Sequence, residues 1–237
     1  SAAARRIPLS VLAELTYRCV YRCPHCCLWP RGGRRAELDA AAWKDIFAQL
    51  AGAGTLFLVL SGGEPFLRED FYELLGAAVD LRFQVRVFTN GYTLGEEDFA
   101  RRAGAGVAGL DISLYSADEA VYDRISGRPG SHRRLRRALE GLGRHGVPFS
   151  LKMPVMRRNA ATVEATARFA ASLGKDLRMD FQIFPDPGRG GAAAEMLEGE
   201  ALAEAFRQSR PWRPRTPRAP RAGDSLNPTA GNPRDEC

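Results

Sequence analysis

Three cysteines lie close together in this chain with a spacing that is typical of metal ligands. Cys19, Cys23 and Cys26 form the pattern C-x3-C-x2-C, Cys27 follows directly, and Cys237 is the fifth cysteine. Thiolates are the preferred ligands of zinc and of iron–sulfur clusters. An odd and clustered set of cysteines argues against a disulfide framework and favours a reducing, cytoplasmic setting. The spacing therefore predicts a metal site.

The number of thiolates indicates which metal centre this stretch would hold. A structural zinc ion takes four ligands, commonly as two pairs, and the sequence offers no second pair. Neighbouring side chains diverge, so Cys27 is not expected to join Cys26 on one centre. Three thiolates suit a [4Fe–4S] cluster with one iron left open, and an open metal position can bind a substrate.

Alternating patterns predict the elements that would position these cysteines. Strand-like runs lie at residues 11–15, 55–60, 84–89, 109–114, 149–155 and 179–184. Helical patterns lie between them, at residues 38–54, 67–81, 96–106, 131–146 and 159–174. Asn159 is placed to cap the last of these helices. Such alternation predicts a parallel α/β sheet, closed either as a doubly wound sheet or as a full or partial β/α barrel.

In both architectures the carboxyl ends of the strands lie along one rim, where the chemistry of these folds collects. The cysteines follow the first predicted strand. Gly62, Gly63 and Glu64 follow the second, Asn90 follows the third, and Ser113 lies at the end of the fourth. We therefore expect all four segments to face the same rim.

The stretch LTYRCVYRCPHC resembles the opening motif of the radical S-adenosylmethionine (SAM) enzymes. The resemblance covers residues 8–190 and implies a partial (β/α)6 barrel, with a [4Fe–4S] cluster on Cys19, Cys23 and Cys26. It further implies that the open iron binds SAM. Reductive cleavage of SAM would then yield a 5′-deoxyadenosyl radical that abstracts hydrogen from a substrate. A flavodoxin- or ferredoxin-type donor is expected to supply the electron.

Later segments resemble further motifs of the same family. LVLSGGEPFL matches the GGE segment, in which Gly62 and Gly63 permit close approach of the backbone to a ligand. The resemblance implies that Glu64 accepts a hydrogen bond from the SAM ammonium group. FTNG, which contains Asn90, resembles the third-strand motif, and Ser113 matches a serine that hydrogen-bonds SAM.

Two more residues are candidates for contact with SAM on the basis of the resemblance. His25 precedes the last cysteine of the motif, where the family usually has an aromatic residue near the adenine. An exposed loop histidine is the alternative interpretation. Gln182 lies in FQIFPDPGRG, which resembles the segment that closes the barrel near the adenosine.

The stretch DISLYSADEAVYDRISGRPGSHRRLRRAL resembles radical SAM enzymes that carry a C-terminal SPASM domain, but it departs from their pattern. A tyrosine and a serine, Tyr115 and Ser116, replace Asp-Gly. Ser126 stands where an arginine that helps to hold SAM is expected. Arg124 and Arg128 are possible replacements, although solvated loop charges are the favoured interpretation of both.

Residues 191–237 are predicted to be a linker and the start of a missing SPASM-like region, with Cys237 as its first cysteine. A lone terminal cysteine is the alternative. Residues 208–237 contain six of the 15 prolines together with six arginines, which predicts an irregular tail. Because prolines space these charges and few aromatic residues lie among them, no nucleic-acid partner is expected. No apolar run approaches the ~20 residues needed to span a bilayer, so no membrane partner is expected.

These features lead to one main hypothesis and two alternatives. The main hypothesis is a radical SAM enzyme that modifies a peptide or protein substrate during maturation. The first alternative is a non-catalytic, degenerate barrel that binds a peptide or a partner. The second is a zinc-stabilised protein that binds nucleic acid through its basic tail. Cleavage of SAM and the metal content distinguish the three.

Overall fold

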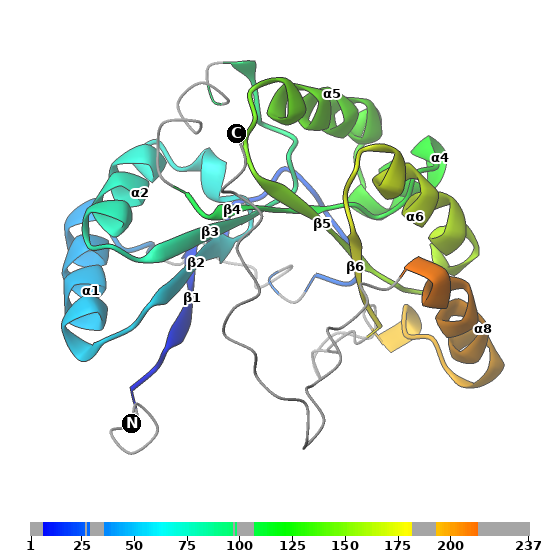
Figure 1. Ribbon diagram of the computed structural model, residues 1–237, viewed down its shortest axis with the longest axis horizontal. Helices are drawn as coiled ribbons and strands as arrows, with labels where there is room; N and C mark the ends of the chain where they lie inside the picture. Colours follow the sequence, from blue (N-terminus) through cyan, green and yellow to red (C-terminus); the bar gives the residue numbers. More distant parts are fainter. Residues whose placement is uncertain are drawn as a thin grey trace, which may run out of the picture.

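The computed structural model describes residues 7–26, 28, 36–96, 98, 107–181 and 193–212. These residues form a curved, six-stranded parallel sheet in the order β1-β2-β3-β4-β5-β6 (Figure 1). The strands are β1 (Ser10–Thr16), β2 (Phe57–Gly62), β3 (Gln84–Thr89), β4 (Gly109–Ser113), β5 (Phe149–Pro154) and β6 (Leu177–Asp180). Together with its helices, this sheet is the partial (β/α)6 barrel that the sequence predicts.

The helices line the outer side of the sheet, as Figure 1 shows. They are α1 (Ala40–Ala53), α2 (Phe71–Asp80), α4 (Glu119–Ser126), α5 (Ser131–Arg144), α6 (Val163–Ser172) and α8 (Gly199–Ser209). Single turns of 3-10 helix lie at η1 (Pro65–Leu67), η2 (Ala160–Thr162) and η3 (Arg210–Trp212). Among the helices that the structure describes, none is long and apolar enough to cross a bilayer.

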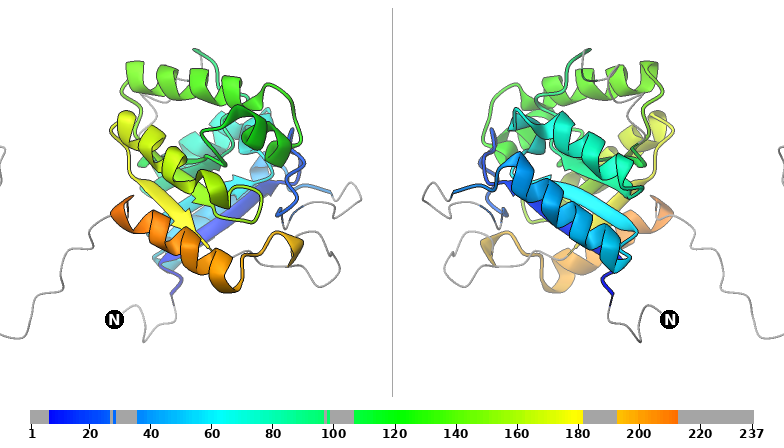
Figure 2. Two further views of the ribbon diagram at one scale, coloured as in Figure 1. Left: turned by 90° about the vertical axis from the view of Figure 1, so that its right-hand side faces the viewer. Right: turned by 90° about the vertical axis from the view of Figure 1, so that its left-hand side faces the viewer.

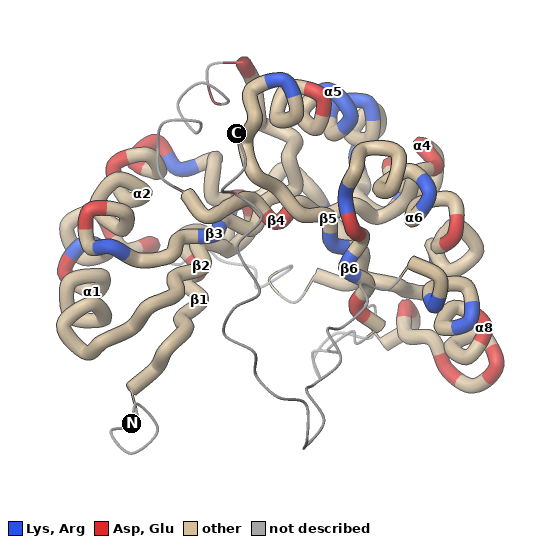
Figure 3. The backbone as a smooth tube through the Cα atoms, viewed as in Figure 1, with Lys and Arg blue, Asp and Glu red and all other residues tan. Residues whose placement is uncertain are grey.

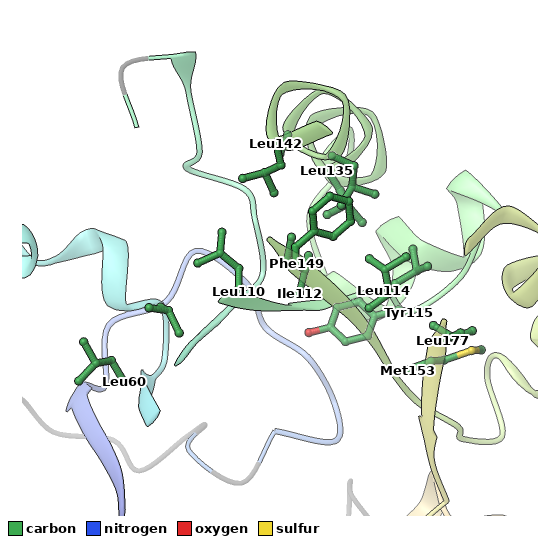
Figure 4. Packing of buried hydrophobic residues seen from close by; sticks show 14 of the residues in the cluster. Leu60, Leu110, Ile112, Leu114, Tyr115, Leu135, Leu142, Phe149, Met153 and Leu177 are labelled. Carbon is green, nitrogen blue, oxygen red and sulfur yellow. The ribbon is translucent and has the colours of Figure 1, made fainter. Parts of the chain in front are cut away.

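The hydrophobic core lies between the sheet and these helices. Alternate residues of each strand point outward, and Leu60, Leu110 and Ile112 are fully buried on this side. Figure 4 shows Leu110 and Ile112 of β4 below Leu135 and Leu142 of α5. Burial of one such side chain contributes about 2 kcal/mol. The core therefore fixes the sheet from outside and leaves its inner face for polar groups.

The inner face carries a buried ionic group in the middle of the sheet. Asp111 of β4 is 3% exposed. Arg86 of β3 donates two hydrogen bonds of 2.8 Å to its carboxylate oxygens. Nζ of Lys152, on β5, lies 3.4 Å from Oδ2 of Asp111. Figure 3 shows the basic positions on these neighbouring strands. A buried carboxylate requires such partners, because burial removes its hydration.

Three elements differ from the sequence expectations. The sequence patterns predict no helix at α4 (Glu119–Ser126). β6 begins at Leu177, two residues before the predicted run, and residues 182–184 of that run lie outside the described residues. Within the range predicted to be a linker, the structure has the helix α8, which packs beside α6 (Figure 2). This helix buries Ala205 and Ser209, which are four residues apart on one face. Most of the predicted helix at 96–106 also lies outside the described residues.

Asn159 does not cap a helix with its side chain. Its Oδ1 accepts a hydrogen bond from the Met156 amide, over 2.7 Å. Its Nδ2 donates to the carbonyl oxygens of Tyr115, over 2.8 Å, and Pro154, over 2.9 Å. The predicted capping role was therefore wrong. Asn159 is fully buried and instead joins the segment after β5 to the segment after β4, because a buried amide must pair all of its polar groups.

Candidate active site

The loop after β1 carries Cys19, Cys23 and Cys26, which are not joined by disulfides. All three line one cavity of about 670 Å³ on the inner face of the sheet. Gly62, the last residue of β2, and Gly63, which follows it, line the same cavity. The remaining predicted site residues that line it are Asn90, Ser113 and His25. The four strand ends therefore face one rim, as the sequence predicts.

The two glycines allow the loop after β2 to approach the cysteine loop closely. Gly62 has φ of +125°, and a Cβ on it would lie 2.3 Å from the Thr16 carbonyl oxygen. A Cβ on Gly63 would lie 2.3 Å from the Arg18 carbonyl oxygen. The Gly63 amide donates to Thr16 O over 2.7 Å, and the Glu64 amide donates to Arg18 O over 2.8 Å. Backbone packing therefore requires glycine at both positions, whether or not a ligand binds there.

Glu64 is fully buried, and its carboxylate connects two loops of the site. Oε1 accepts a hydrogen bond from the Thr89 hydroxyl, and Oε2 accepts one from the Asn90 amide, both over 2.8 Å. The side chain therefore joins the loop after β2 to the loop after β3. Its role toward the SAM ammonium group stays a prediction.

Cys19 receives two hydrogen bonds in this arrangement. The Tyr21 amide donates to its Sγ over 3.4 Å, and Nδ2 of Asn90 donates over 3.6 Å. Burial raises the pKa of the Cys19 thiol, and the bond from Tyr21 opposes that shift. Donors directed at sulfur favour the thiolate form that a metal requires.

Cys23 is more deeply buried and contacts a tyrosine that the sequence did not identify as a site residue. Its Sγ lies 3.2 Å from Oη of Tyr115, and the thiol donates in this pair. Burial raises the pKa of the Cys23 thiol to about 12. In the metal-free protein this thiol is therefore protonated at neutral pH, and metal binding must displace its proton.

Aromatic rings form the wall beside the cysteines. Tyr115 packs edge-on against His25, with 5.4 Å between ring centroids, and lies 5.1 Å from the ring of Tyr122. Tyr21 meets Tyr122 edge-on at 6.4 Å. Burial lowers the pKa of His25 to about 4, so its ring is neutral at pH 7. The sequence shows several tyrosines near the motifs. It does not show that their rings would meet, because the contacts join segments that lie far apart in the chain.

Ser126, which stands where an arginine is expected, is fully buried. Its Oγ lies 2.7 Å from Oγ of Ser131, and its carbonyl accepts from the Arg22 amide over 2.8 Å. Arg128 lies over the ring of Tyr92. The guanidinium group of Arg22 donates to the carbonyls of Cys19 and Tyr21, and this residue lines the cavity. Arg22 thus brings positive charge to the site beside Ser126.

The donor set distinguishes a cluster from a single ion. Within the described ranges, no group of three or more His, Cys, Asp or Glu side chains converges on one metal ion. A [4Fe–4S] cube binds each of its thiolates at a different corner, so its ligands do not converge on one point. Three free thiols around a cavity fit the cube better than they fit zinc. Gln182, Cys27 and Cys237 lie outside the described residues.

Comparison with known proteins identifies similar chains. The family model described as "Radical SAM superfamily" matches residues 13–170. The PqqA peptide cyclase of Gluconobacter oxydans is 35% identical over 168 residues, which cover 70% of this chain and 47% of that protein. The chain therefore spans about half the length of the curated relatives it matches.

Solved structures share the fold. Streptococcus suis SuiB bound to S-adenosylmethionine aligns with a TM-score of 0.72 and 18% identity, over 88% of this chain and 48% of SuiB. SuiB bound to the precursor peptide SuiA aligns with a TM-score of 0.66 and 19% identity, over 75% of this chain and 41% of SuiB. At 18–19% sequence identity, this similarity shows a shared fold only.

Proposed function

Because the chain belongs to the radical SAM superfamily, we propose that it modifies a peptide or protein with the help of SAM and a [4Fe–4S] cluster. The superfamily uses both cofactors. When bound, they supply the one-electron cleavage of SAM that starts hydrogen abstraction from the substrate. The observation that carries the proposal is the position of three free cysteines around the cavity that the later motifs also line.

In this proposal Cys19, Cys23 and Cys26 hold the cluster. Their thiols surround the cavity and already have hydrogen-bonding groups directed at two of them. Since all three cysteines lie on a single loop, the fold of that loop sets their separation. The Glu64 amide, which donates to Arg18 O, and the Ser126 carbonyl, which accepts from the Arg22 amide, hold that loop in place.

The remaining site residues would bind and orient SAM. Ser113 and the edge formed by Gly62 and Gly63 offer polar backbone and hydroxyl groups on the cavity wall. The neutral ring of His25 offers an aromatic surface of the kind that an adenine requires. Arg22 supplies positive charge for a carboxylate, in place of the arginine that Ser126 replaces.

The walls of the cavity would exclude water from the reaction. Phe88 and Leu67 line it from the strand side and the η1 turn, and Tyr21 and Tyr115 line it beside the cysteines. Such a wall protects a reactive species from side reactions with solvent. The protein thus positions and shields, while the cofactors supply the difficult chemistry.

A peptide is the substrate that the comparisons support best. One similar protein is a PqqA peptide cyclase, and the fold is shared with SuiB, which was solved with a precursor peptide. We infer that this chain takes part in the modification of a peptide of the same general class. The flavodoxin- or ferredoxin-type electron donor, the cytoplasmic location and the absence of a nucleic-acid partner stay predictions from the sequence.

Anaerobic reconstitution with iron and sulfide tests the proposal. The full chain is expected to bind about four irons per monomer, to absorb in the visible range, and to release 5′-deoxyadenosine with dithionite and SAM. Cys19→Ala, Cys23→Ala and Cys26→Ala should each lose the product. Cys27→Ala is the matched control and should keep it.

The other outcomes correspond to the alternative functions. Zinc in place of iron and sulfide would contradict the proposal and favour a zinc-stabilised protein. A full cluster that binds SAM without releasing 5′-deoxyadenosine would contradict it in favour of a non-catalytic barrel. Loss of the product in Cys27→Ala would show that the wrong set of cysteines was assigned.

A further inference from the structure

The hydroxyl group of Tyr115 is placed against a cysteine of the site. Its Oη lies 3.2 Å from Sγ of Cys23, although 92 residues separate the two in sequence. Both are buried, with 6% of Tyr115 and 7% of Cys23 exposed. In Figure 4 this hydroxyl points away from α5 and toward the loop that follows β1. The contact is therefore shielded from solvent.

Several neighbours hold the tyrosine in this position. Nδ2 of Asn159 donates to the Tyr115 carbonyl over 2.8 Å and fixes its backbone. Its ring packs against the rings of His25 and Tyr122. Rotation of the side chain would displace these packed rings. These contacts hold the hydroxyl beside Cys23.

The direction of this hydrogen bond depends on the state of the sulfur. When the Cys23 sulfur carries a proton, the thiol donates to the phenol oxygen, as in the structure. A metal-bound cysteine is a thiolate and has no proton to donate. The phenol is both a donor and an acceptor, so it can donate to the thiolate instead. An aspartate, which the related motif has at this position, would only accept when ionised.

We propose that Tyr115 donates a hydrogen bond to the Cys23 thiolate of the bound cluster and so raises the reduction potential of that cluster. This inference rests on the proposed function. Reduction adds negative charge to the cluster and its sulfur ligands. A donor at a ligand sulfur stabilises the reduced state more than the oxidised state. Tyr115 is therefore a positioning and tuning residue, and it acts through Cys23.

The test is a reductive titration of the reconstituted full chain, followed by electron paramagnetic resonance. Tyr115→Phe is expected to have a more negative midpoint potential than the wild type at equal iron content. Tyr122→Phe is the matched control, because it removes a buried hydroxyl from the same group of rings. That hydroxyl donates to the Ser113 carbonyl over 3.2 Å. The control is expected to keep the wild-type potential.

A second variant tests the same bond without a change of shape. A fluorinated tyrosine at position 115 is a stronger donor and is expected to shift the potential in the positive direction. An unchanged potential in both position-115 variants would overturn the inference, as would an equal shift in Tyr122→Phe. If Tyr115→Phe does not retain its cluster, the fluorinated variant decides alone. Failure of the wild type to bind any cluster would instead reject the proposed function.

Discussion

The side-chain amide of Asn90, after β3, donates a hydrogen bond to Sγ of Cys19, after β1, over 3.6 Å. The same residue is fixed on two other sides. Its Oδ1 accepts a hydrogen bond from the Tyr92 backbone amide over 2.9 Å. Its backbone amide donates to the Glu64 carboxylate over 2.8 Å. One asparagine therefore links the ends of three strands around a cysteine that we assign to the cluster.

Asn90→Asp tests this link by a change of one atom. The new carboxylate would lie beside the Cys19 thiolate and would repel it. We expect the cluster to be retained about tenfold less tightly, in keeping with the effect of outer-shell changes at metal sites. The rate of iron release to a chelator under anaerobic conditions measures this. Equal rates for the variant and the wild type would contradict the assigned contact.

Gly63→Ala should destabilise the protein through a backbone clash. The added Cβ would lie 2.3 Å from the Arg18 carbonyl oxygen, so the cysteine loop or the loop after β2 must move. We expect a loss of about 2 kcal/mol in the free energy of unfolding, together with lower iron incorporation. Urea denaturation and iron analysis measure the two effects.

Gly76→Ala is the control for the substitution at Gly63. A Cβ on Gly76, in the middle of α2, would meet nothing within 4 Å. Replacement of glycine by alanine within a helix stabilises by about 0.5–1 kcal/mol. We expect the free energy of unfolding to rise in Gly76→Ala and to fall in Gly63→Ala. Similar changes in both variants would contradict the predicted clash at Gly63.

Asp123 should make stability depend on pH. Its carboxylate accepts from the Ser131 hydroxyl and the His132 amide, over 2.8 and 2.9 Å, at the start of α5. Burial alone would raise the pKa of Asp123, but these hydrogen bonds outweigh burial and lower it from 3.8. The stabilisation is therefore complete above pH 3.8 and is lost as the pH falls below that value.

Asp123→Asn removes this dependence. At pH 6 the variant should be about 1 kcal/mol less stable than the wild type, because hydrogen bonds to a charged acceptor contribute more than those to a neutral amide oxygen. Because the wild-type carboxyl becomes protonated in acid, the difference should shrink as the pH falls below 3.8. Urea denaturation of the metal-free protein across this range measures it. A difference that does not vary with pH would contradict the expected role.

Asp111→Ala should destabilise the inner face of the sheet. It leaves Arg86 and Lys152 without their shared carboxylate, and the side chains of these two residues are 35% and 30% exposed. Because water reaches part of both cations, we expect a loss of about 2 kcal/mol, below the range for a fully buried pair. The double variant Arg86→Met with Asp111→Leu should lose less, as measured by urea denaturation. A larger loss in the double variant would contradict this account.

Much of the fold follows from local patterns in the sequence. The runs at 84–89 and 109–114 became β3 and β4 because their alternate apolar residues meet the helices. The cysteines and the later motifs gathered on one rim because parallel strands share their carboxyl ends. α8 was missed, since only its packing against α6 reveals which of its faces is buried. Short amphipathic segments beside a proline-rich region give a weak signal.

The sequence predicts which residues lie at the site better than it predicts the contacts that these residues make. The orientation of Glu64 toward Thr89 depends on a turn whose dihedral angles the sequence does not define. The contact between Tyr115 and Cys23 spans 92 residues and requires the barrel to be formed. Spacing identifies which side chains come near the rim. It does not identify the second layer of groups that touches them.

The anchoring of the cysteine loop has a consequence for the biogenesis of this protein. Its backbone is held by Glu64 on one side and by Ser126 on the other, about a hundred residues further along the chain. In a zinc finger, by contrast, the ion brings a short, unstructured peptide together. Here the loop gains its second anchor only when α4, which ends at Ser126, packs against it. A nascent chain that ends before Ser126 therefore lacks one of the two anchors of the cysteine loop.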